Sequence, residues 1–130
     1  MFSNTFFTVL TVALAGLNVA SATPVTPTFD AVKCYFIVTP SPNLGPEALQ
    51  TSINYAVGRK TGGSWPNTIL QTDNKIFEHN DGTYDLESII EVDGVGAADI
   101  ITFVESWDEE TIDGLQAQWK VNAVNCYDQA

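Results

Sequence analysis

Histidine and cysteine are scarce in this chain, which holds one histidine (His79) and two cysteines (Cys34 and Cys126). A single histidine excludes a two-histidine acid–base pair and a multi-histidine zinc site. The chain also lacks a G-x-S-x-G sequence of the kind that presents a nucleophilic serine. The sequence therefore predicts a protein that is not an enzyme, with no catalytic residue, no metal site and no cofactor.

Basic residues are few as well. The chain has five lysines and arginines and 16 aspartates and glutamates, which gives a net charge of −11 at pH 7. Nucleic acids and anionic membrane surfaces are polyanions and would repel such a chain. The composition argues against both as partners and is typical of a soluble extracellular protein.

Only one long apolar run occurs, at residues 6–20, and its length suits a signal-peptide core better than a membrane span. Ala20-Ser21-Ala22 then gives the small-x-small pattern that signal peptidase requires, although no lysine or arginine precedes the apolar run. We predict a signal peptide over residues 1–22, cleaved before Thr23, and one secreted domain over 23–130. An uncleaved membrane anchor is the alternative.

Both cysteines lie in the predicted secreted domain, where the compartment is oxidising. We therefore expect a Cys34–Cys126 disulfide between the first strand and the C-terminal tail. Closing so long a loop stabilises a domain by about 4–5 kcal/mol in the chain-entropy model. Free thiols or an intermolecular bridge are the alternatives.

Hydrophobic periodicity predicts one helix among several strands. Strand 31–39 is apolar on both faces and is therefore expected in the centre of a sheet. The helix is predicted over 46–57, with an apolar stripe that Gly58 ends. Further strands are predicted over 67–72, 75–79, 83–92, 97–107 and 115–123, with an acidic connection over 108–114.

The predicted fold class is α+β, with one helix packed on a mostly antiparallel sheet of five to six strands. A half-closed β-barrel with one helix is the alternative. Residues 115–123 alternate between apolar and polar, and Val124 and Cys126 fall out of phase with that pattern. A β-bulge near Ala123 would reconcile the two.

Asp81-Gly82 is a typical hairpin turn between strands 75–79 and 83–92. A two-residue turn would pair Phe77 with Leu86 and His79 with Tyr84, and we prefer it because like residues then face each other. A three-residue turn, which pairs Phe77 with Asp85, is the alternative.

The preferred register sets Glu78 directly across from Asp85, on an acidic strand face that also carries Glu87 and Glu91. Like charges directly opposite each other are destabilising. The face would then either bind a cation or simply be solvated, and its spacing does not match an EF-hand loop.

Trp65 lies in a predicted Gly/Ser/Pro loop, close to Arg59 and Lys60 at the negative end of the predicted helix. An exposed tryptophan is a common anchor for a sugar or a protein partner. We therefore take Trp65, Arg59 and Lys60 as candidate binding residues. The alternative is that Trp65 caps an open end of the core.

Three features resemble those of small secreted fungal proteins, including effector-like ones. They are the processing region Ala20-Ser21-Ala22-Thr23-Pro24, the secreted domain of about 110 residues and the Cys34/Cys126 pair. This is a resemblance to a broad class rather than to one family. It implies an interaction outside the cell.

A second resemblance is to cystatin-type inhibitors, which wrap a sheet around one helix. Ile90-Glu91-Val92-Asp93-Gly94 is similar to their Q-x-V-x-G motif, with Ile in place of Gln, and Trp65-Pro66 is similar to their second loop. The two segments stand in the wrong order along the chain, so no residue role is transferred.

Three hypotheses follow from the sequence. The first is a secreted, non-enzymatic interaction protein that binds an extracellular protein or glycan. The second is a protease inhibitor that uses loop 61–66 or loop 92–96. The third is a small carboxylate-dependent hydrolase.

Overall fold

The structure, a computed structural model, describes residues 29–129, and the predicted signal peptide (1–22) with its cleavage site lies outside them. Among the described helices, none is long and apolar enough to cross a membrane. Residues 29–129 form two helices and five strands: β1 (Val32–Ser41), α1 (Pro46–Ser64), β2 (Leu70–Glu78), β3 (Tyr84–Val92), α2 (Ala97–Glu105), β4 (Thr111–Asp113) and β5 (Gln118–Asp128).

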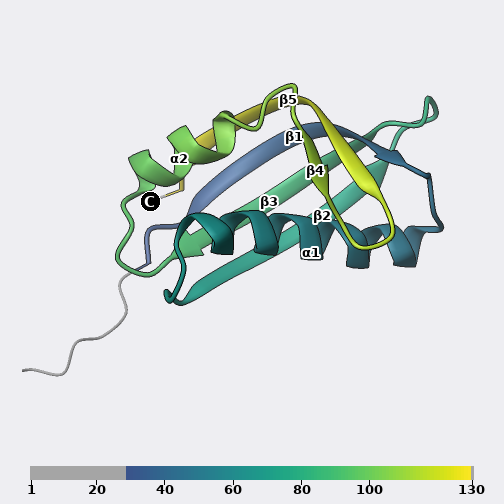
Figure 1. Cartoon of the computed structure of the whole chain (residues 1–130). Helices are drawn as coiled ribbons and strands as arrows, with labels where there is room; N and C mark the ends of the chain where they lie inside the picture. The colour runs from purple at the N-terminus through teal and green to yellow at the C-terminus, as the bar shows by residue number, and fades with distance from the viewer. Residues whose placement is uncertain (1–28, 130) are drawn as a thin grey trace, which may run out of the picture.

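The strands form a single curled sheet in the order β2-β3-β1-β5-β4, with every neighbouring pair antiparallel (Figure 1). Without the short β4, the connectivity is that of the split β-α-β arrangement, in which two helices connect the strands of one antiparallel sheet. The predicted α+β class and the central position of the first strand are confirmed. The curl makes the sheet a half-barrel, which was the predicted alternative.

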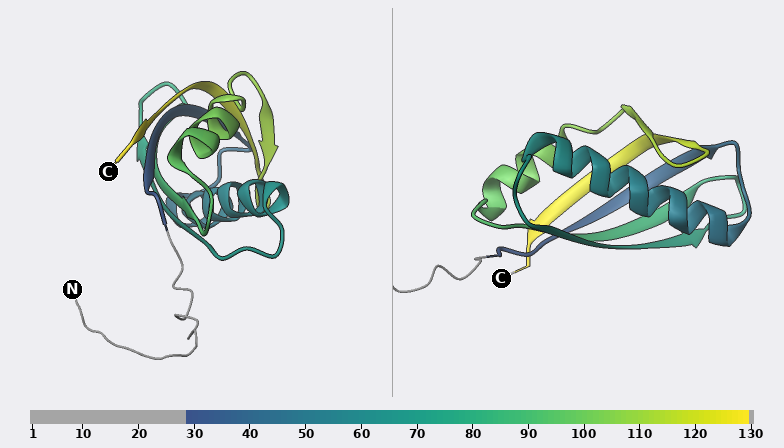
Figure 2. Two further views of the ribbon diagram at one scale, coloured as in Figure 1. Left: turned by 90° about the vertical axis from the view of Figure 1, so that its left-hand side faces the viewer. Right: turned by 60° about the horizontal axis from the view of Figure 1, so that its bottom comes forward.

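The two faces of the sheet differ in what covers them. Alternate residues of a strand point to opposite faces, and in β1 the side chains of Val32, Cys34 and Phe36 are buried while Tyr35 and Ile37 are exposed. We call the side that carries α1 and α2 the inner face and the other side the outer face. The curl wraps the inner face around both helices (Figure 2).

Helix α1 is longer than predicted, because it continues through Gly58 and ends at Ser64 instead of Val57. Its predicted apolar stripe is confirmed: Leu49, Ile53, Ala56 and Val57 are all buried. Glycine lowers helix propensity but does not forbid a helix whose face is buried. The prediction that Gly58 ends the helix is therefore wrong.

The predicted strand over 97–107 is also wrong, because residues 97–105 form helix α2. Ala97, Ile100 and Val104 are buried and follow helical spacing. The run is rich in β-branched residues, and a short apolar run does not by itself distinguish a buried helix from a strand. The described part of the chain consequently has two helices over the inner face instead of one.

The hairpin between β2 and β3 has the register that we did not prefer. Phe77 pairs with Asp85 and Glu78 with Tyr84, which is the three-residue turn. Gly82 has a φ of +89°, as expected in a three-residue hairpin loop, where a left-handed glycine follows a turn. The predicted strands 67–72 and 75–79 are one strand, β2.

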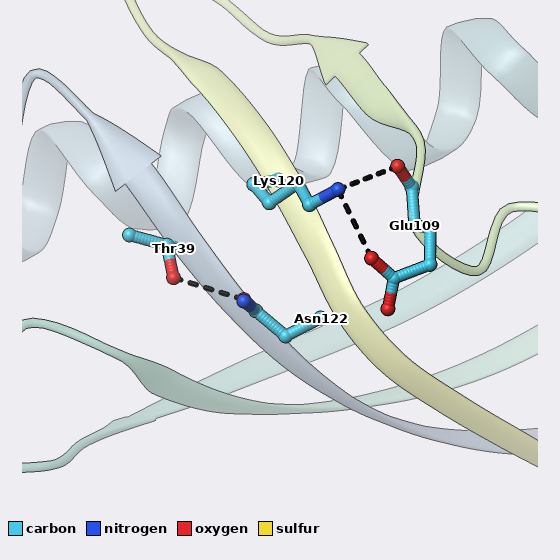
Figure 3. Close-up of polar contacts among 4 residues, drawn as sticks. All are labelled: Thr39, Glu109, Lys120 and Asn122. Atoms are coloured by element: carbon cyan, nitrogen blue, oxygen red, sulfur yellow. Dashed lines mark hydrogen bonds and ion pairs between the residues drawn. The ribbon is translucent and has the colours of Figure 1, made fainter.

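The predicted bulge in the last strand is confirmed. The register between β1 and β5 shifts between Ile37 and Val38, so that Asn122 is the extra residue. The Thr39 hydroxyl donates to the side-chain carbonyl of Asn122 at 2.9 Å, and the Lys120 ammonium donates to the Glu109 carbonyl at 2.6 Å and its carboxylate at 3.3 Å (Figure 3). These contacts connect β5, at the bulge and two residues before it, to β1 on one side and to Glu109 on the other.

The predicted disulfide is present: Cys34 and Cys126 are directly opposite each other on β1 and β5, with their Cα atoms 4.0 Å apart. The partner segment is therefore a strand and not a loose tail. The backbone N–H of Cys126 donates to the Glu105 carboxylate of α2 at 3.0 Å. The disulfide thus joins two neighbouring strands where α2 packs on them.

The β4–β5 hairpin is held against α1 by a buried polar contact. The indole N–H of Trp119 donates to the Ser52 hydroxyl at 2.9 Å, and both side chains are fully buried. Gly114, in the hairpin, leaves no space there: a Cβ atom on it would clash with the Ser52 hydroxyl and lie 2.8 Å from the Trp119 indole nitrogen. Only glycine fits at this position.

This contact predicts opposite effects for two glycine substitutions. Gly114→Ala should lower the free energy of unfolding by about 1–3 kcal/mol, because the new methyl group overpacks the junction. Gly58→Ala is the matched control, since a Cβ atom there meets nothing within 4 Å and alanine favours a helix interior by about 1 kcal/mol. Urea unfolding measures both values. Equal destabilisation by the two substitutions would contradict the described packing.

Candidate functional site

Of the three predicted binding residues, Trp65 was expected to be exposed, but it is not. It follows the last residue of α1, is half-buried, and packs edge-on against Phe103 of α2 at 5.0 Å between ring centroids. The segment 61–64 belongs to α1, so the predicted loop 61–66 is mostly helical. Trp65 covers an end of the core, which was the alternative interpretation.

Arg59 and Lys60 lie on α1, on the side of the helix that faces β4. The Lys60 ammonium forms an ion pair with Glu110 at 3.2 Å and lies 5.7 Å from the centroid of the Trp107 ring. Arg59 donates to the Tyr55 hydroxyl at 3.3 Å. Both basic residues line a cleft of about 250 Å³ between α1 and β4, and Trp65 does not line it.

The predicted acidic strand face is neither as acidic nor as continuous as expected. Glu78 pairs with Tyr84, whose side chain is buried on the inner face, so Glu78 does not oppose Asp85. Asp85 forms an ion pair with His79 at 2.8 Å, and Glu87 forms one with Lys33 at 3.6 Å. The outer side chains of β3 are therefore largely neutralised by neighbouring strands.

A cation has no obvious site on this face. Glu91 pairs with Gln71, away from the ion pairs of Asp85 and Glu87. Within residues 29–129, no group of three or more histidine, cysteine, aspartate or glutamate side chains is arranged to hold a metal ion.

The outer face carries an exposed apolar patch that the sequence analysis missed. Tyr35 and Tyr127 contact each other edge-on, with ring centroids 5.5 Å apart, and Ile37 lies on the same side of β1. Phe77 extends the patch across Asp85, which lies between Phe77 and Ile37 in the strand register. We call Tyr35, Ile37, Phe77 and Tyr127 the outer patch; they are between 37% and 49% exposed.

The outer face is hollowed beside this patch. A depression of about 340 Å³ is lined by side chains and backbone of β1, β3 and β5, namely Tyr35, Phe36, Ile37, Asp85, Leu86, Glu87, Ala123, Val124 and Asn125. The bulge at Asn122 makes Asn122 and Ala123 consecutive outward residues, and the short Ala123 side chain leaves space beside Ile37. The bulge therefore shapes the outer face.

A signal for the outer patch was present in the sequence. Strand 31–39 is apolar on both faces, which led to the expectation that it lies in the centre of the sheet. The strand is central, as expected, but no described element covers Tyr35 and Ile37. An apolar outer side on a central strand can indicate burial or an exposed patch, and only the arrangement of the helices distinguishes the two.

His79 lies at the end of β2, where it faces Asp85 instead of packing on Tyr84 as predicted. The hydrogen bond and the negative charge of Asp85 raise the pKa of His79 above its usual value near 6.5. In the adjoining turn, the hydroxyl and backbone N–H of Thr83 donate to Asp81 and lower the pKa of that carboxyl group. The hairpin tip is thus a small exposed charge network.

No protein-family model, curated protein or solved structure that was compared with this chain matches it.

The His79–Asp85 pair predicts a specific pH dependence of stability. Because the folded-state pKa of His79 is raised, its contribution is fully present below about pH 6.5 and is lost as the pH rises through the folded-state pKa. Since His79 is the only histidine, one NMR signal reports its pKa directly. Asp85→Asn should return that pKa towards 6.5 and remove the pH dependence of urea unfolding between about pH 6 and 8. An unchanged His79 pKa in this variant would contradict the pairing.

Proposed function

We propose that this protein is a secreted, non-enzymatic interaction protein that binds an extracellular protein partner through the outer patch. The observation that carries the proposal is the gathering of Tyr35, Ile37, Phe77 and Tyr127 on the sheet face that no described helix covers. The site differs from the one expected at Trp65, which is half-buried.

The size of the patch supports a binding role. A large aromatic side chain has roughly 200 Å² of surface, and each member of the outer patch is between about a third and a half exposed. Together the four side chains present roughly 300–400 Å² of apolar surface, a size at which the largest patch of a soluble monomer is often functional.

The charges around the patch favour a protein partner over a glycan. Asp85 is already bound to His79 at 2.8 Å, and Glu87 lies 3.6 Å from Lys33. A glycan gains most from carboxylates whose oxygens are unpaired acceptors for its hydroxyl groups, whereas an apolar protein surface needs only that nearby charges stay paired. Paired charges also lower the desolvation cost of covering the patch.

Secretion is supported by two features. The Cys34–Cys126 disulfide is of a kind that persists in oxidising compartments outside the cytosol. The apolar run and the Ala20-Ser21-Ala22 sequence have the pattern of a cleavable signal peptide.

A site-specific photo-crosslinker tests the proposal. Benzoylphenylalanine replaces Tyr35 in the outer patch or, as a matched control, Tyr55 on α1; these tyrosines are 37% and 42% exposed. Each purified protein is irradiated in the extracellular fluid of the producing cells, and adducts are identified by mass spectrometry. We expect one discrete protein adduct from position 35 and no adduct with the same protein from position 55, because only position 35 lies in the patch.

Competition sharpens this test. Excess unlabelled protein should abolish the adduct, whereas excess Ile37→Thr/Phe77→Thr protein should compete at least about tenfold less well, since it lacks two of the apolar side chains that a partner would bury. An adduct with carbohydrate, an adduct with a second copy of the chain, or equal labelling of the same protein from position 55 would each overturn the proposed protein partner.

A further inference from the structure

The cleft between α1 and β4 is separate from the outer patch and shares no lining residue with the hollow of the outer face. We propose that this cleft binds a small monocarboxylate, held by Arg59 and Lys60 of α1 and by the backbone N–H groups of Thr111 and Asp113 of β4. The inference does not depend on the proposed function.

Arg59 is an unusual residue in so acidic a chain. Among residues 29–129 no carboxylate lies within ion-pair distance of it, although the protein has 16 acidic residues and only five lysines and arginines. Its Nη1 group donates to the Tyr55 hydroxyl, and the guanidinium lies 5.9 Å from the Tyr55 ring centroid. Tyr55 thereby orients the guanidinium and leaves most of its donors available for a carboxylate.

Lys60 supplies the second positive charge of the helix wall. Its side chain is 31% exposed and its ammonium is bonded to Glu110 at 3.2 Å. An ammonium group has three donors, so Lys60 can keep its ion pair with Glu110 and still donate a hydrogen bond to a further carboxylate. The residue is fixed by the Trp107 ring on one side and by Glu110 on the other, which limits the side-chain entropy lost on binding.

Backbone donors of the strand wall point towards the same cleft. The Val121 N–H donates to the Glu110 carbonyl at 2.8 Å, which identifies these two residues as a hydrogen-bonded pair of the β4–β5 ladder. Because such pairs alternate along an antiparallel ladder, the N–H groups of Thr111 and Asp113 point away from β5. β4 is the edge strand and its free side borders the cleft, so these N–H groups face the space between β4 and α1.

The remaining walls select the kind of anion. Ala56 and Ile112 are buried and give the cleft an apolar floor that suits a short hydrocarbon group. Asp113 lines the cleft and Glu110 is ion-paired with Lys60 beside it, and both carboxylates would repel a second negative charge, so a monoanion is favoured over a dianion such as the doubly charged form of phosphate. A volume of about 250 Å³ admits only a small ligand or the end of a longer one.

The test uses four probes on the complete secreted chain, followed by amide NMR and calorimetry. Isovalerate represents a free small acid and acetyl-Gly-Val represents a peptide C-terminus; acetyl-Gly-Val-amide and inorganic phosphate are the controls. We expect isovalerate or acetyl-Gly-Val to shift the backbone amide signals of Thr111 and Asp113, and the amide and phosphate to leave them unchanged. The carboxylate that binds more tightly shows whether the ligand is a free small acid or a peptide C-terminus.

Variants then locate the site. Arg59→Gln should weaken binding of the stronger carboxylate about tenfold or more, because it removes a charge-assisted hydrogen bond. Arg59→Lys keeps the charge, loses the planar fork, and should give an intermediate affinity. Lys75→Gln on the outer face is the matched control, and its effect should stay within about twofold.

Three results would overturn the inference. The first is no shift of the Thr111 and Asp113 signals by either carboxylate at about 50 mM, a concentration well above a millimolar dissociation constant. The second is tighter binding of phosphate than of isovalerate. The third is equal loss of affinity in Arg59→Gln and Lys75→Gln. None of these results bears on the outer patch, so the proposed function stands or fails on its own experiment.

Discussion

The contact between Gly114, Ser52 and Trp119 is the constraint on which the rest of the structure depends. Ser52 and Trp119 are 67 residues apart, and their buried hydrogen bond ties the β4–β5 hairpin to the first half of α1. Since Gly114 has no space for a side chain, the hairpin lies directly on the helix. This closes one side of the curled sheet, encloses the Trp119 indole, and leaves the cleft at Arg59 and Lys60 farther along the same helix.

The central strand β1 is the second element on which the fold depends. It pairs with β3 on one side and with β5 on the other, and the Cys34–Cys126 disulfide makes the β1–β5 pairing covalent. One strand therefore supplies buried residues to the inner face and exposed residues to the outer face. The bulge at Asn122 keeps Trp119 and Cys126 both inward although their positions in the sequence differ by an odd number, and it hollows the outer face beside Ile37.

The sequence was sufficient where one physical signal dominated. The disulfide, the buried stripe of α1, the central first strand and the bulge were all predictable from pairing chemistry and periodicity. The helix at 97–105 was not, because a short apolar run rich in β-branched residues is compatible with a strand or a helix, and its packing against the sheet decides between them. The hairpin register was decided by the left-handed Gly82 and not by matching side chains. The location of neither candidate site could be predicted. Arg59 lies beside β4, and Tyr35 contacts Tyr127, only in the folded chain.

The sheet has an inner face that stabilises the fold and an outer face that is free to bind. The most direct test is the free energy of unfolding of a variant in which Tyr35, Ile37, Phe77 and Tyr127 are all threonine, a residue that keeps β propensity. We predict a loss of about 2 kcal/mol or less, because only cross-strand contacts such as the Tyr35–Tyr127 pair are removed. Trp119→Ala, from the inner face, should cost about 3–5 kcal/mol. A loss from the outer-face variant as large as that of Trp119→Ala would show that the outer patch serves the fold, and would contradict the account.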